Sequence, residues 1–140
     1  MMIDTVIIQS IDGEGRLVLS GAERDSLDQT GYAFATLVLS GLVARTRICL
    51  HQGAALIYLF EDMAAAEQWW KGEKCAETLD GELRLKCTSD NLDHFDVEVS
   101  LRSLQNYWVV KGVLLVENRQ CERIIRDLKQ FFNLATADAN

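Results

Sequence analysis

Apolar and polar residues alternate along much of the chain, in short runs that predict β-strands. The alternation is clearest over residues 94–101, where Phe95, Val97, Val99 and Leu101 are separated by polar residues. Similar or continuously apolar runs predict further strands at residues 5–8, 16–20, 31–39, 44–50, 83–87 and 107–116. Residues 21–30 are mostly polar and are predicted to form a solvated loop.

Two segments change to the spacing of three and four that is typical of amphipathic helices. The first runs from about Leu56 to Trp70 and is predicted to end at Gly72, a residue suited to the conformation after a helix end. The second covers residues 121–132 and carries Arg123, Arg126 and Lys129 on its polar side. Each helix has one apolar stripe, so each is expected to pack on a sheet.

The order of these elements predicts an α+β fold, with a curved antiparallel sheet of about seven strands and two helices on one face. The 140 residues fit a single domain, 1–140. The turn at 11–14, Ile-Asp-Gly-Glu, returns at 79–82 as Leu-Asp-Gly-Glu, and a strand follows each. Two interpretations stay open: a duplicated βββα unit (residues 5–70 and 73–133), or two hairpins that use the same turn residues.

One hydrophobic core is expected beneath the helices. The residues predicted to be buried in it are Leu17, Leu56, Phe60, Met63, Leu85, Val97, Val99, Ile125 and Leu128.

The net charge of −7 predicts that nucleic acid is not a partner, because phosphate binding uses a basic surface. It favours a basic protein partner instead. The chain shows neither a signal-peptide pattern nor the roughly 20 apolar residues that cross a bilayer, so we expect a cytoplasmic protein without a membrane partner. Four scattered cysteines without a CxxC pair indicate reduced thiols. A homodimer is left open.

His94 lies among Asp90, Asp93 and Asp96, the nearest approach to an acid–base cluster in the chain. A histidine beside carboxylates can transfer protons. Cross-strand pairing of this polar face with Arg84 and Lys86 explains the same residues, and we favour that interpretation. No catalytic constellation is predicted.

No metal or cofactor is predicted either. Cys49 and His51 are close in sequence, but a zinc site requires three or four ligands and no second pair lies nearby.

Trp69 and Trp70 are adjacent, so both cannot occupy the centre of one helical stripe. Trp70 continues the stripe, and Trp69 is expected at its edge. There Trp69 either anchors a partner or covers the rim of the sheet, and we favour the second interpretation.

From Trp70 onward the chain resembles an uncharacterised bacterial family, the domain of unknown function 6228. The resemblance is carried by Trp70 with Gly72 and Glu73, by the run 79–83 (Leu-Asp-Gly-Glu-Leu), and by Asp90 and His94. The family pattern favours glycine before the histidine, whereas this chain has Asp93. The resemblance implies no activity, although some small acidic bacterial proteins of this kind look like immunity proteins of toxin systems.

The preferred functional hypothesis is therefore a non-enzymatic protein-binding module of immunity-protein type. The alternative is a small-molecule-binding protein or hydrolase with a pocket between sheet and helices, which would use Glu73, His94 and Asp96. The candidate binding residues are Trp69, Trp70, Glu73, Asp90, His94 and Asp96.

Overall fold

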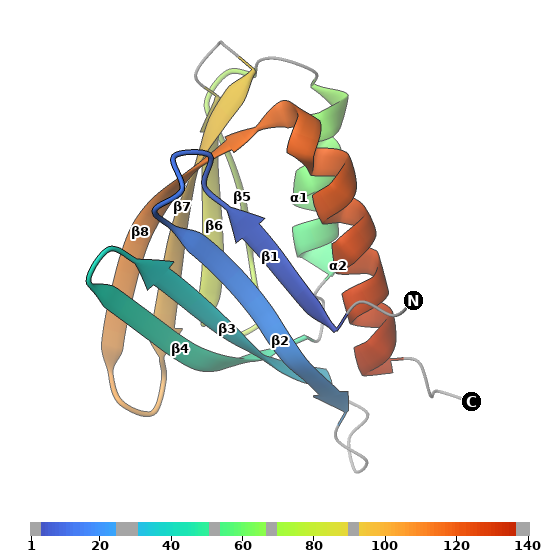
Figure 1. Ribbon diagram of the computed structural model, residues 1–140. Helices are drawn as coiled ribbons and strands as arrows, with labels where there is room; N and C mark the ends of the chain where they lie inside the picture. Colours follow the sequence, from blue (N-terminus) through green and yellow to red (C-terminus); the bar gives the residue numbers. More distant parts are fainter. Residues whose placement is uncertain (1–3, 25–30, 51–53, 67–69, 90–92, 137–140) are drawn as a thin grey trace.

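The computed structural model describes residues 4–24, 31–50, 54–66, 70–89 and 93–136. These residues form an α+β fold with two four-stranded antiparallel sheets and two α-helices (Figure 1). In the first sheet the strands follow chain order: β1 (Thr5–Gln9), β2 (Arg16–Arg24), β3 (Gly31–Leu39) and β4 (Leu42–Cys49). The second sheet repeats that order with β5 (Glu73–Glu77), β6 (Leu83–Ser89), β7 (His94–Ser103) and β8 (Trp108–Glu117).

The predicted single curved sheet of about seven strands is therefore wrong, because the chain builds two sheets. After β4, helix α1 carries the chain away, and β5 then pairs with β6 rather than with β4. Strand β5 was missed because its sequence, Glu-Lys-Cys-Ala-Glu, has neither β-branched nor aromatic residues. The predicted loop at 21–30 also began too early, since β2 continues past a bulge between Ser20 and Glu23 to Arg24.

Both helices lie on one side of the molecule (Figure 1). Helix α1 (Ala54–Ala65) packs against β5, and α2 (Cys121–Thr136) packs against β1, β2 and α1. The first helix is shorter than predicted: it ends at Ala65, so Trp70 lies outside it. Within the described residues, neither helix is long and apolar enough to cross a membrane.

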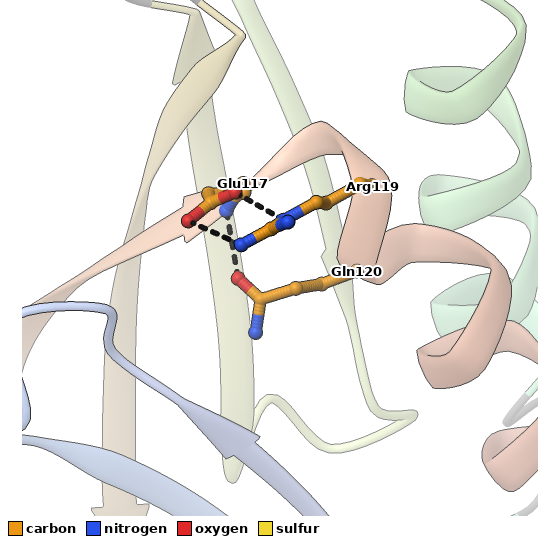
Figure 2. A network of polar contacts seen from close by, with 3 residues as sticks. All are labelled: Glu117, Arg119 and Gln120. Carbon is orange, nitrogen blue, oxygen red and sulfur yellow. Dashed lines mark hydrogen bonds and ion pairs between the residues drawn. The ribbon is translucent and has the colours of Figure 1, made fainter.

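A short polar network joins β8 to α2 (Figure 2). The Glu117 N–H donates to Oε1 of Gln120 at 2.8 Å, across the 3₁₀ turn η1 (Asn118–Gln120) that opens the helix. The Glu117 carboxylate pairs with the Arg119 guanidinium, with Nε and Oε2 2.5 Å apart. Such reciprocal contacts satisfy backbone donors at a helix start and so fix the direction in which α2 leaves the sheet.

The core is one cluster that draws on both sheets and both helices. Of the residues predicted to be buried, Ile125 alone is only partly buried, because it lies on the flank of α2. Ile124 takes the inward position. The others are buried as predicted: Leu17, Leu56, Phe60, Met63, Leu85, Val97, Val99 and Leu128.

The two sheets approach each other closely where β3 ends against β8. A Cβ atom added to Gly112 would lie 2.6 Å and 2.7 Å from the two Cδ atoms of Leu39. A Cβ on Gly15 would lie 2.8 Å from Cδ2 of Leu114. All three distances are shorter than real Cβ atoms show, so glycine at these two positions permits this approach.

Candidate functional site

The described members of the predicted binding set do not form one cluster. Trp70 is 7% exposed and belongs to the core, where its ring centroid lies 5.6 Å from that of Phe95. The Lys74 ammonium lies 5.8 Å from the Trp70 ring. Trp69 and Asp90 fall outside the described residues.

Glu73 and Asp96 lie on one cross-strand row of the second sheet, because each is paired in register with Thr88 of β6. The Glu73 carboxylate forms an ion pair with Lys86, with Oε2 and Nζ 3.1 Å apart. This hydrogen-bonded partner raises the pKa of Lys86. Lys86 is thus paired with Glu73 of β5, and its register partner on β7 is Glu98.

His94 opens β7 in register with Glu117, and Glu117 is one of the three residues whose polar contacts Figure 2 shows. Glu73 lines a hollow between α1 and β5, but neither His94 nor Asp96 lines it. The structure thus does not bring Glu73, His94 and Asp96 into that hollow. Asp93 has a φ of 70°, a left-handed conformation that explains why glycine is favoured just before the histidine in the resembling pattern.

A different set of residues surrounds a cavity of about 740 Å³ at the edge of β4. This volume lies within the range of about 300–1,000 Å³ that is usual for ligand sites. We call it the arginine groove, lined by Tyr32, Phe34, Arg45, Thr46, Arg47, Ile48, Glu82, Ser103, Leu104, Gln105, Asn106 and Trp108.

Two arginine–aromatic stacks form one wall of the arginine groove. The Arg45 guanidinium carbon lies 4.1 Å from the ring centroid of Phe34, and that of Arg47 lies 4.0 Å from the ring centroid of Tyr32. The antiparallel register puts Phe34 opposite Arg47, which places all four side chains on one face of the sheet. The Arg47 side chain is 54% exposed, so its guanidinium is accessible from solvent, and it forms an ion pair with the exposed Glu23 carboxylate at 3.8 Å.

Glu82 contributes a buried side chain to the same cavity. It precedes the first residue of β6 and is only 7% exposed. Its Oε1 accepts a hydrogen bond from the Thr78 hydroxyl at 2.7 Å, and its Oε2 accepts one from the Cys49 N–H at 3.3 Å. Glu82 therefore connects the second sheet to the edge strand of the first.

The arginine groove was not predicted, although part of its signal is visible in the sequence. Tyr32 and Phe34 alternate with small residues on one strand, and Arg45 and Arg47 alternate on the next. Their meeting depends on the register of β3 and β4. The contribution of Glu82 and of the turn before Trp108 depends on how the two sheets meet.

The sequence profile of a family of unknown function (DUF6228) matches residues 8–135. The chain belongs to this family, as its sequence resemblance indicated. No curated protein matches the chain.

Two solved structures are similar to the chain at low sequence identity. "Structure of the plant transcriptional regulator PBF-2" shares the fold and is 9% identical, with a TM-score of 0.52 over 95% of this chain and 83% of that chain. "Crystal Structure of WHY3 from Arabidopsis thaliana" is 10% identical, with a TM-score of 0.46 over 92% of this chain and 86% of that chain.

The likeness to a transcriptional regulator overturns the prediction that excluded nucleic acid as a partner. That prediction, like the expectation of a basic partner, was drawn from the net charge of the whole chain. A total of −7 does not describe the local field at Arg45 and Arg47, which neighbour each other on one strand face.

Proposed function

We propose that this protein binds single-stranded nucleic acid, which lies across the outer face of β3 and β4 and enters the arginine groove. The observation that carries the proposal is the pair of arginine–aromatic stacks at the edge of the first sheet. Proteins that bind single strands combine a positive groove for the backbone with aromatic side chains on which bases stack. The fold that the chain shares with a transcriptional regulator is compatible with this role.

Each part of the arginine groove has a task in this proposal. The guanidinium groups of Arg45 and Arg47 bind phosphates, and the planar face of each guanidinium that is turned away from its ring accepts a stacked base. Trp108 offers a further ring inside the cavity. Tyr107 adds support from the adjoining turn: it is 92% exposed and has a φ of 58°, a strained conformation for an aromatic residue.

Fluorescence anisotropy with a labelled oligodeoxythymidylate of about 15 nucleotides tests the proposal, since single-strand sites cover about 4–16 nucleotides per fold. The double variant Arg45→Ala/Arg47→Ala should weaken binding at least about tenfold. It should also reduce the slope of log K against log salt by about 1.4, because each lost phosphate contact removes about 0.7.

The control is Arg84→Ala, which removes one positive charge, half the number that the double variant removes, from an exposed strand position on the second sheet. It should leave affinity and salt slope close to those of the unaltered protein. Failure of the unaltered protein to bind the oligonucleotide at low salt would refute the proposal. The proposal would also be refuted if the loss of binding free energy per charge removed were the same in the double variant and in Arg84→Ala.

A protein-binding module of immunity-protein type remains a second candidate, in a bacterial cytoplasm as the sequence suggested. It is favoured by exposed apolar side chains on β8 and the turn before it, Leu104, Tyr107, Val109 and Val113. Under this hypothesis Val109→Ser/Val113→Ser should abolish capture of a protein partner from the native lysate while oligonucleotide binding is unchanged. A nucleic-acid role predicts the reverse pattern, with binding lost on substitution of the two arginines.

A further inference from the structure

We propose that Glu82 gives the arginine groove a preference for guanine over the other bases. This inference rests on the proposed function, since it assigns a base to the same cavity. The structural basis is that Glu82, a residue only 7% exposed, lines the space in which a base would lie.

Glu82 retains the capacity to accept hydrogen bonds. An ionised carboxylate has about four lone-pair sites on two oxygens. The described hydrogen bonds occupy one lone-pair site on each oxygen: Oε1 accepts from the Thr78 hydroxyl, and Oε2 accepts from the Cys49 N–H. These two contacts hold the carboxylate in one orientation, so a ligand would not have to order it on binding.

Guanine is the base whose chemistry suits this acceptor. Its Watson–Crick edge presents two adjacent donors, N1–H and the N2 amino group, which match the two oxygens of a carboxylate. The donor groups of adenine, cytosine and thymine each lie beside an acceptor atom, which would face a carboxylate oxygen. A buried polar site rejects a ligand that leaves its groups unpaired or opposed.

The rest of the cavity is consistent with a nucleotide. Trp108 lines it and provides a ring for stacking. Arg45 and Arg47 face two carboxylates, Glu82 in the cavity lining and Glu23, which pairs with Arg47. Because the Glu23 side chain is 66% exposed, a phosphate can replace it as the partner of Arg47. The amide side chains of Gln105 and Asn106 add donors and acceptors around the base.

Glu82 also has a structural role, because it ties Cys49 of the first sheet to Thr78 of the second. A role limited to this tie would affect binding of every base equally. A change in base preference is therefore the readout that separates recognition from structure. Glu82→Gln keeps the shape and one acceptor oxygen but replaces the other oxygen with a donor.

The experiment compares four labelled oligonucleotides that differ at one central position of a thymidine tract: dG, deoxyinosine, dA or dT. The unaltered protein should bind the dG oligonucleotide about tenfold more tightly than the dT one. Deoxyinosine should be intermediate, because it keeps N1–H but lacks the N2 amino group. Glu82→Gln should bind all four with the affinity of the dT tract, and the control Glu98→Gln should keep the preference.

The inosine comparison uses the unaltered protein, so it holds even where Glu82→Gln fails to fold. Equal binding of all four oligonucleotides by the unaltered protein overturns the guanine preference and leaves the proposed function intact. A preference for dG that persists in folded Glu82→Gln overturns the assignment to Glu82. Absence of binding to any of the four overturns the proposed function and this inference with it.

Discussion

The contact between Gly112 and Leu39 offers a sharp test of how the two sheets meet. In Gly112→Ala the new Cβ would lie 2.6 Å and 2.7 Å from the Leu39 methyl carbons and 3.2 Å from Cγ. Rotation of the methyl groups does not clear the Cγ contact, so the whole Leu39 side chain must shift. Such overpacking costs about 1–3 kcal/mol of unfolding free energy, and reduced freedom of the unfolded chain offsets about 0.4–1 kcal/mol.

The partner change Leu39→Ala removes the obstructing atoms. Leu39 is only partly buried, so its truncation should cost about 2 kcal/mol, near the lower limit for leucine. In the double variant the methyl group introduced by Gly112→Ala enters space that Leu39 has left. The double variant should therefore lose less than the two single variants together, with an interaction energy of about 1 kcal/mol.

Urea unfolding of the four proteins, followed by fluorescence, measures this double-mutant cycle. The control cycle pairs Leu39→Ala with Gly13→Ala, because a Cβ on Gly13 meets no atom within 4 Å. The control should be additive. Additivity within about 0.5 kcal/mol in the Gly112 cycle as well would show that β3 and β8 do not meet at this contact.

Three further predictions concern the core, the thiols and one turn. Ile124→Ala should cost about 2–5 kcal/mol in urea unfolding, and Ile125→Ala markedly less, because only Ile124 is fully buried. N-ethylmaleimide should label exposed Cys75 before Cys121, as read by peptide mass spectrometry, because burial raises the pKa of Cys121 to about 11. Asp12→Asn should destabilise the fold at neutral pH but not at low pH. The Glu14 N–H donates to the Asp12 carboxylate and lowers its pKa. The carboxylate therefore stabilises the fold above the ordinary aspartate pKa of about 4, and this contribution is lost as the pH falls. The structure would be contradicted if Ile124→Ala and Ile125→Ala cost the same unfolding free energy, or if Cys121 were labelled before Cys75. It would also be contradicted if the effect of Asp12→Asn did not depend on pH.

Alternation in the sequence predicted those strands that have one buried and one exposed face. The run at 94–101 became β7, with Phe95, Val97, Val99 and Leu101 all buried. The same rule failed for β5, whose positions are exposed or only partly buried, so no apolar alternation marks them. Local sequence also could not specify that β4 and β5 do not pair with each other. This depends on the direction in which α1, which connects them, leads the chain.

The candidate site was harder to predict than the fold, because it depends on long-range register. The sequence placed Arg45 and Arg47 on one strand face, but it did not indicate that Phe34 and Tyr32 lie beneath them. The sequence around Glu82 does not indicate that the carboxylate is buried, because one of its hydrogen-bond donors, the Cys49 N–H, comes from the edge of the other sheet. Glu82 and the strand that carries Arg45 and Arg47 are far apart in the sequence, and they line one cavity only because the two sheets pack together.

The two sheets have the same internal order and each is followed by a helix, so we propose that the ββββα halves descend from one duplicated unit. The recurring Asp-Gly-Glu turns support this proposal. In each turn the glycine N–H donates to the carbonyl three residues earlier, at 3.0 Å for Gly13 and 2.9 Å for Gly81. Both glycines are left-handed, with φ of 81° and 74°.

Equivalent turns should respond equally to backbone strain, except where their surroundings differ. Alanine at either glycine should cost about 1 kcal/mol, because a side chain disfavours positive φ. Gly81→Ala should cost more, since its Cβ would lie 2.9 Å from the Arg102 guanidinium that donates to the Asp80 carbonyl. Repeating both changes in an Arg102→Ala background should make the two costs equal in urea unfolding. If the two unfolding costs still differed, the turns would not be equivalent in backbone shape. The recurring Asp-Gly-Glu sequence would then no longer support the duplication.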